Sequence, residues 1–130
     1  GPDKTALCTD SMRGAGMPDG EYILGSLTNG QRVIVEDGVA KMPDRSCFAG
    51  SVATTDRLVR TMVQIAETPL VDAVRMMTLT PARIIGADRR KGSIAIGKDA
   101  DLVIFDDRIT VLATIIQGNV VYSQNKQSTI

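Results

Sequence analysis

The sequence predicts an α/β fold in which two groups of short strands flank a central helical stretch. Apolar runs between residues 21 and 42 are separated by Asn-Gly and Asp-Gly pairs, which are typical of hairpin turns. Apolar residues then recur at helical spacing between residues 51 and 86. Three more apolar runs of strand length lie between residues 102 and 122.

Composition limits the kinds of partner that the chain could bind. Its 130 residues are enough for one compact domain, and 15 Lys and Arg balance 15 Asp and Glu. A neutral total gives no electrostatic basis for binding nucleic acid or an anionic membrane surface. The longest apolar runs have only four or five residues, which is too short to span a bilayer. We therefore expect no nucleic-acid partner and no membrane partner.

Cysteine and histidine usage bears on the compartment and on metal binding. The chain has two cysteines, Cys8 and Cys47, and no histidine. We expect two free, buried thiols in a reducing cytoplasm, with a disulfide as the alternative. The cysteines lack the CxxC spacing of a zinc site, and catalytic zinc is normally held by clustered His, Cys or carboxylate ligands. We therefore expect the chain to bind no catalytic metal by itself.

The sharpest candidate for chemistry lies near the start of the chain. The run TALCTD at 5–10 predicts a short buried strand that ends in the carboxylate of Asp10, and RGAGMPDG at 13–20 predicts a loop. Barrel enzymes place catalytic groups at the carboxyl ends of buried strands, where a carboxylate can accept and return a proton. The alternative is that Asp10 caps the following loop through backbone amides.

The remaining elements follow from turn and helix signals. Strands at 21–24, 31–35 and 39–42 predict a small antiparallel meander. A helix is expected after the possible N-caps at 51–55, a second is expected to start at Thr68-Pro69, and a third at Thr80-Pro81 is expected to end at Gly86. Residues 91–106 predict a turn that leads into a core strand. The strands at 111–116 and 120–122 follow, and the polar tail at 123–130 is expected to fray.

Several of these segments resemble one family of enzymes in their order and approximate spacing. The similarity runs from about residue 10 to 122 and is with the N-acetylglucosamine-6-phosphate deacetylase family of the amidohydrolase superfamily. Its most specific parts are a T-D-x-M motif followed by A-G-x-P-D-G and a later A-G-S. These segments read LCTDSM at 7–12, AGMPDGEYILG at 15–25, FAGS at 48–51, AVRMMTLTPARIIG at 73–86 and KGSIAIGKDADLVIFD at 91–106.

The resemblance implies the C-terminal portion of a (β/α)8 amidohydrolase barrel plus part of the small accessory β-domain. A whole barrel takes roughly 250 residues, so only its last part fits in this chain. Residues 1–20 would be the last barrel strand and the catalytic loop, and 21–50 a small β-meander and the substrate loop. Residues 51–90 would be the C-terminal barrel helices, and 91–130 the accessory β-domain strands and the tail.

The resemblance also implies a reaction and a site. Asp10 matches the catalytic aspartate, which acts as general base and then general acid in deacetylation of N-acetylglucosamine 6-phosphate. Phe48, Ala49 and Gly50 match a loop that contacts the sugar. Leu is more frequent in the family where Phe48 stands, and Ala where Ser11 stands. The divalent metal, expected to be zinc, has its ligands upstream of the matched region, so we expect the isolated chain to be inactive. Exposed strand edges and apolar faces predict a homo-oligomer.

Two alternatives remain open at this stage. The chain could be a fragment of another amidohydrolase, such as a dihydroorotase or a deaminase, because the turn-strand run at 91–106 is shared among these enzymes. It could instead be a stand-alone, non-catalytic β-rich module that binds a partner protein. The first alternative changes the substrate and keeps the enzyme class, whereas the second removes the enzymatic role.

Overall fold

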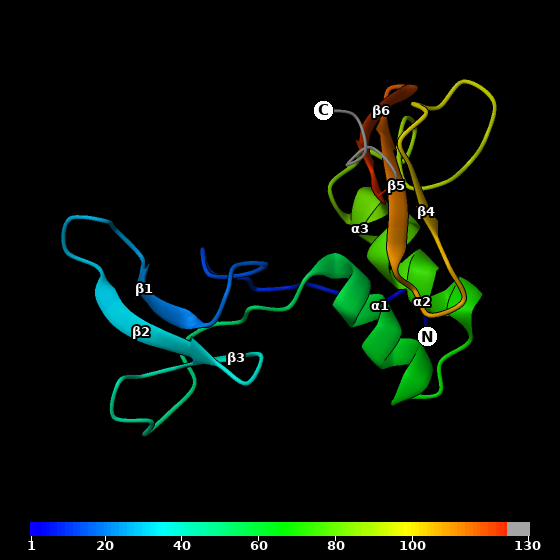
Figure 1. Cartoon of the computed structure of the whole chain (residues 1–130). Coiled ribbons are helices and arrows are strands. Elements are labelled where there is room, and N and C mark those ends of the chain that lie inside the picture. Colours follow the sequence, from blue (N-terminus) through cyan, green and yellow to red (C-terminus); the bar gives the residue numbers. More distant parts are fainter. Residues whose placement is uncertain (125–130) are drawn as a thin grey trace. The chain divides into compact units, whose positions relative to one another are not determined.

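The computed structural model describes residues 1–124 and confirms a mixed α/β protein with six strands and three helices (Figure 1). The chain divides into two compact units. Unit 1 comprises residues 1–7 and 59–130, and unit 2 comprises residues 8–58. Unit 2 contains the first three strands, and unit 1 contains two of the three helices and the last three strands.

Unit 2 is built on the antiparallel sheet β1–β2–β3, as the meander pattern predicts. Its strands are β1 (Gly20–Leu24), β2 (Gln31–Glu36) and β3 (Val39–Lys41). Asp37 and Gly38 form the two-residue turn between β2 and β3, and both have positive φ (53° and 71°), as a type I′ turn requires. The buried side chains of this unit form one cluster: Met12, Val33, Val35, Ala40 and Ala49.

The predicted strand at 5–10 is wrong, because this segment lies in no strand of the structure. Its residues are exposed or half-buried. The Leu7 amide donates to the carbonyl of Met76 at 2.9 Å, and the first bridge to another segment comes only at Ser11. A strand needs a continuous neighbour for its backbone groups. No other described segment pairs with residues 5–10 as a continuous strand.

The helical region agrees with the sequence, with a small shift at the starts. The helices are α1 (Thr55–Gln64), α2 (Leu70–Met77) and α3 (Leu79–Ile84). Pro69 occupies the N-cap of α2 instead of its first turn, and α2 has no side-chain cap hydrogen bond, so Thr68 does not cap it. Gly86 has φ 69° and donates its amide to the carbonyl of Arg83, ending α3 as predicted.

Unit 1 has its own sheet, β4–β5–β6, with strands β4 (Leu102–Phe105), β5 (Val111–Ile116) and β6 (Asn119–Ser123). The helices lie beside this sheet in Figure 1. A second core cluster joins the two layers, and its buried members are Val59, Ala73 and Ile109. Residues 125–130 lie outside the described residues, so most of the expected frayed tail is not tested.

The expectation of a buried core strand at 102–105 is wrong. Val103 is 53% exposed and Ile104 is 50% exposed. Consecutive strand residues point to opposite faces of a sheet, so neither face of β4 is fully covered at these positions. In the turn before it, Ile94 and Ile96 are also exposed. Local sequence identifies the strand, but no described layer covers both of its faces.

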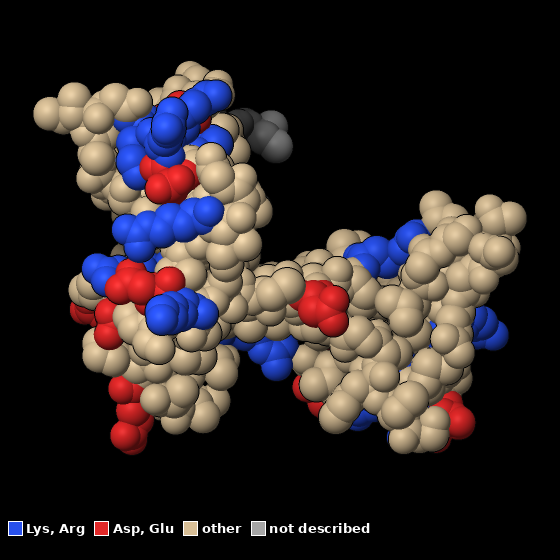
Figure 2. Space-filling view, turned by 180° about the vertical axis from the view of Figure 1, so that it is seen from behind, with Lys and Arg blue, Asp and Glu red and all other residues tan. Residues whose placement is uncertain are grey.

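Figure 2 shows Lys and Arg side chains next to Asp and Glu side chains on the face that it presents. Asp99 forms ion pairs with both Arg90 and Lys91, each at 3.0 Å. No helix among residues 1–124 is long and apolar enough to cross a membrane.

Candidate functional site

The two segments singled out in the sequence meet in unit 2 through Ser51. The Met12 amide donates to the Ser51 carbonyl at 2.8 Å, and the Ser51 amide donates to the Asp10 carbonyl at 3.3 Å. These bonds form a short parallel bridge between Ser11 and Ser51. Gly50 directly precedes Ser51, so the bridge holds Asp10 close to the loop 48–50 although they are about forty positions apart in the sequence.

Two serine hydroxyls strengthen this junction. The Ser11 hydroxyl donates to the carbonyl of Ala53. The Ala53 amide donates to Oγ of Ser51 at 2.9 Å, in a side-chain turn typical of serine in loops. Ser51 therefore stabilises the loop ahead of α1, which begins four residues later at Thr55. The junction is held by hydrogen bonds that need no other part of the protein.

Asp10 has an unusual backbone and an exposed side chain. Its φ is 47°, in the left-handed region that few residues other than glycine adopt and that aspartate tolerates better than most. Its carboxylate makes no hydrogen bond or ion pair with any described residue. The capping interpretation required bonds from this carboxylate to loop amides, and residues 1–124 contain none.

The loop 48–50 is anchored at its middle residue and open at both ends. The buried Ala49 donates its amide to the carbonyl of Ala40 in β3 at 2.9 Å. Phe48 is 74% exposed. Gly50 has φ 78°, and an added Cβ there would make only ordinary contact with Met12. Backbone conformation, and not a lack of space, therefore requires glycine at this position.

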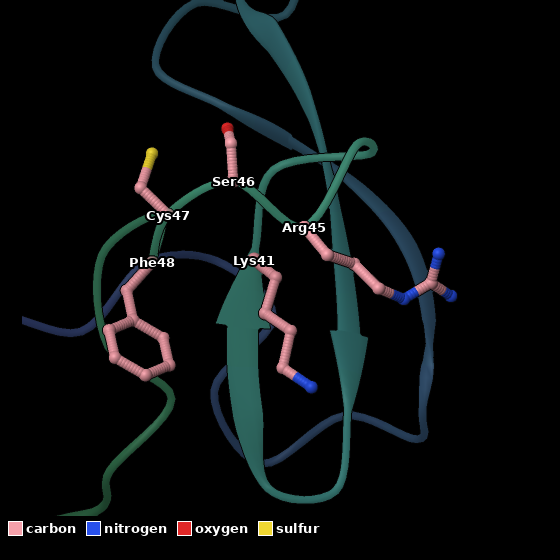
Figure 3. Close-up of a pocket in the computed structure, with 5 residues that line it drawn as sticks. All are labelled: Lys41, Arg45, Ser46, Cys47 and Phe48. Carbon is pink, nitrogen blue, oxygen red and sulfur yellow. The ribbon is translucent and has the colours of Figure 1, made fainter.

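An open hollow of about 430 Å³ lies beside Phe48 (Figure 3). Figure 3 shows the Phe48 ring and the Lys41 side chain extending in the same direction from neighbouring segments, while Arg45 points to the other side. The residues that line the hollow are Lys41, Arg45, Ser46, Cys47 and Phe48.

Glu36 organises the charges next to this hollow. Arg45 binds its carboxylate with two hydrogen bonds, of 2.9 Å and 3.1 Å, and Lys41 adds a third at 3.2 Å. Hydrogen bonds from Arg45 first, and then from Lys41, lower the pKa of Glu36 from 4.5 to about 2. Glu36 therefore stays ionised at any pH above about 3 and keeps both cations in place.

Sequence reasoning did not find Lys41, Arg45 or Glu36. The Asp37-Gly38 turn and the strands around it were visible in the sequence, and they place Lys41 on β3. What the sequence did not supply is the pairing of β3 with the loop that follows it. That pairing brings Lys41 opposite Phe48.

The cysteine expectation is half right. Both Cys8 and Cys47 are free thiols, but both are exposed instead of buried. Cys47 lies in the loop that leads to Phe48, and Cys8 lies in the segment that failed to form a strand.

No metal-binding group is present in the part of the chain that the structure describes. Residues 1–124 contain no set of three His, Cys, Asp or Glu side chains that could hold a metal ion. The described residues therefore do not fit a catalytic metal.

Comparison with known proteins places the chain in a family. The model of the amidohydrolase family matches residues 5–121. A cow N-acetylglucosamine-6-phosphate deacetylase is 33% identical over 121 residues, which cover 93% of this chain and 29% of that protein. An N-acetylgalactosamine-6-phosphate deacetylase of Escherichia coli O157:H7 is 37% identical over 116 residues, which cover 89% of this chain and 29% of that protein.

Solved structures give the same result for the fold. The N-acetylglucosamine-6-phosphate deacetylase of Pasteurella multocida has a TM-score of 0.82 and 31% identity, and the match covers 91% of this chain and 30% of that one. An aspartate-to-alanine variant of the Mycobacterium smegmatis enzyme, solved with N-acetyl-D-glucosamine-6-phosphate, has a TM-score of 0.83 and 35% identity. This match covers 95% of this chain and 32% of that one. This chain thus spans less than a third of the length of these relatives. The resemblance read from the motifs is confirmed, and the chain belongs to the amidohydrolase family.

Proposed function

We propose that this chain is the part of an N-acetylglucosamine-6-phosphate deacetylase that carries the catalytic carboxylate and one substrate loop. The observation that carries the proposal is the junction at Ser51, which joins the Asp10 segment to the Phe48–Gly50 loop by two backbone hydrogen bonds. Relatives with this activity in their names match nearly the whole chain. In this assignment residues 1–20 supply the catalytic aspartate and its loop, and 51–90 the C-terminal barrel helices. Residues 91–130 belong to the accessory β-domain.

The chemistry assigned to this chain is a proton relay. Asp10 accepts a proton from the water that attacks the N-acetyl carbonyl carbon. It then gives that proton to the nitrogen as the C–N bond breaks, so the products are acetate and glucosamine 6-phosphate. The exposed Phe48 offers an apolar surface to the sugar ring. Gly50, which has no side chain, lets a ligand approach the loop backbone.

The divalent metal of the proposed whole enzyme, zinc in our assignment, is held by residues outside this chain. The described residues provide no ligand set for it. The isolated chain should therefore release no acetate from N-acetylglucosamine 6-phosphate at any zinc concentration. We also assign the protein to the cytoplasm and to a homo-oligomer, the latter because large apolar side chains such as Ile96 and Val121 are exposed.

A chimeric enzyme tests the role of Asp10. The stretch of the Mycobacterium smegmatis enzyme that matches this chain is replaced by the chain, and acetate release from N-acetylglucosamine 6-phosphate is measured. Asp10→Asn should lower kcat by about 10²–10⁴-fold, the usual contribution of a general acid–base group. Asp107→Asn, at an exposed aspartate outside the site, is the matched control. Circular dichroism checks that both variants are folded. If they are, and if Asp10→Asn and Asp107→Asn have similar kcat values, the assignment is refuted.

A second candidate substrate is N-acetylgalactosamine 6-phosphate. The Escherichia coli O157:H7 relative named for that substrate is 37% identical, compared with 33% for the cow relative named for the glucosamine derivative. The two sugars differ only in the orientation of one ring hydroxyl. Measuring kcat/KM of the chimera for both sugars decides between them, and the larger value identifies the substrate.

A further inference from the structure

We propose that Ser11 is a positioning residue for Asp10. Its hydroxyl binds the Ala53 carbonyl and thereby fixes the direction in which the backbone presents the Asp10 carboxylate. The proposal rests on the proposed function for the catalytic role of Asp10. The attachment itself is argued from three features of unit 2: the unheld carboxylate of Asp10, the two backbone bonds that meet at Ser51, and a separate attachment at Ala53.

The first feature is that the direction of the Asp10 carboxylate depends on the backbone around it. This carboxylate makes no hydrogen bond or ion pair with any of residues 1–124, so no side-chain contact fixes it. The φ of Asp10 is 47°, in a small allowed region, and a change in this angle would turn the carboxylate. A proton relay needs the carboxylate within hydrogen-bond reach of the reacting groups. Whatever holds the adjacent backbone therefore controls whether Asp10 can act.

The second feature is that both backbone bonds of the Asp10 segment involve one residue. The Ser51 amide donates to the Asp10 carbonyl at 3.3 Å, and the Met12 amide donates to the Ser51 carbonyl at 2.8 Å. These bonds place the segment beside the loop at 48–50. Because they meet at Ser51, they restrict rotation of the segment about that residue less than a longer strand pair would. A second attachment, away from Ser51, is needed to fix the orientation.

The third feature is that the Ser11 hydroxyl supplies this second attachment. It donates to the carbonyl of Ala53, 42 positions away in the sequence, so the bond is not part of a local turn. The Ala53 amide donates to Oγ of Ser51 at 2.9 Å, which holds Ala53 from its other side. The acceptor that Ser11 binds is therefore itself held in place. The residue after Asp10 is attached at both Ser51 and Ala53, and two points of attachment define its orientation.

The competing explanation is that Ser11 only adds to the stability of unit 2. Ser11 is exposed and water can replace part of its bond, so both explanations predict a modest effect of its removal. The frequent alanine at this place in the family indicates the same modest size. The explanations differ in whether the effect needs the Asp10 carboxylate. A structural serine affects activity with or without that carboxylate, whereas a positioning serine affects it only when the carboxylate is present.

The first measurement is hydrogen exchange of the ¹⁵N-labelled 130-residue chain. Ser11→Ala should lower protection of the Met12 amide by about 2–10-fold, the equivalent of one hydrogen bond, and leave the β1–β3 amides unchanged. Ser11→Thr keeps the hydroxyl and should keep the protection. Ser26→Ala is the matched control, because Ser26 is an exposed loop serine of the same unit whose hydroxyl accepts only the nearby Thr28 amide, at 3.2 Å.

The second measurement is acetate release by the chimeric deacetylase. Ser11→Ala should lower kcat by about 2–10-fold with KM unchanged, because the lost bond orients the proton-relay group and does not touch the substrate. Ser11→Thr should restore kcat, and Ser26→Ala should leave it unchanged. In the Asp10→Asn background, Ser11→Ala should cause no further loss, since no carboxylate remains to be oriented.

Each result decides the proposal. A local loss of Met12 protection, together with a loss of kcat that needs the Asp10 carboxylate, supports it. It is overturned by unchanged Met12 protection, by an equal loss of protection in β1–β3, by a kcat equal to that of Ser26→Ala, or by the same loss in the Asp10→Asn background. Full activity of Asp10→Asn alone would instead refute the proposed deacetylase, and the Met12 amide would still show whether Ser11 holds the segment.

Discussion

Replacing Val33 by alanine should destabilise unit 2, which contains the candidate site, and leave unit 1 unchanged. Val33 is completely buried in the cluster that also contains Met12 and Ala49, the residues that hold the Asp10 segment and the substrate loop. Removing two buried methyl groups costs about 2 kcal/mol. A unit of about 50 residues has a total stability of only about 3–8 kcal/mol. The substitution therefore removes a quarter or more of the free energy that keeps this unit folded.

Native-state hydrogen exchange measures this loss locally. With Val33→Ala, protection of the β1–β3 amides should fall about 30-fold, the equivalent of 2 kcal/mol. Ile96→Ala is the control, because Ile96 is fully exposed and its truncation should change stability by less than about 0.5 kcal/mol. The amides of α2 report on unit 1 in the same sample. If protection of the β1–β3 amides falls less than threefold, or falls equally in the Ile96→Ala control, the cluster around Val33 does not hold unit 2 together.

Three further predictions concern backbone, pH and association. Gly30→Ala should lower Tm more than Gly16→Ala, because an added Cβ at Gly30 would overlap two backbone carbonyl oxygens, whereas at Gly16 it would meet open space and oppose only the positive φ of 73°. Equal Tm values would contradict this. The lowered pKa of Glu36 stabilises the fold above pH 4.5, and this contribution should disappear as pH falls toward 2. Glu36→Gln should flatten that part of the unfolding profile in urea. Light scattering should show concentration-dependent self-association that Ile104→Lys reduces, and a strictly monomeric chain would refute it.

The parts of the fold that the sequence predicted are those with a local cause. Asp37-Gly38 gives the two-residue turn because both residues tolerate positive φ. The stripe of apolar residues at helical spacing gives α1, and Gly86 ends α3. In each case the residues that determine the structure lie within one turn of the chain, so no distant contact can overrule them.

The parts that failed depend on surfaces distant in sequence. Residues 5–10 have the apolar content of a buried strand, but a strand forms only where another segment accepts its backbone hydrogen bonds. Leu102–Phe105 does form β4, yet its burial requires layers on both faces, and the described residues do not supply them. An apolar pattern thus indicates which side chains a segment could bury, whereas their actual burial depends on which other segments pack against it.

The candidate site shows the same division. Motif resemblance selected Asp10 and Phe48, and it gave no information on whether they meet. The two segments are joined by the bridge between Ser11 and Ser51, which no local sequence pattern predicts. Lys41 was missed because its relation to Phe48 arises from pairing between β3 and an irregular loop. Unlike the Asp37-Gly38 hairpin, this pairing has no turn dipeptide in the sequence that would predict it.

The chain therefore positions Asp10 and the loop at 48–50 relative to each other but leaves Asp10 and both ends of the loop exposed. Hydrogen bonds at Ser51 suffice to position Asp10 beside the loop, but exclusion of water from its carboxylate needs a covering surface. The solved relatives, which are about three times as long, offer a source for that surface. Positioning without enclosure is the physical reason to expect that this chain can bind a substrate weakly and cannot turn it over.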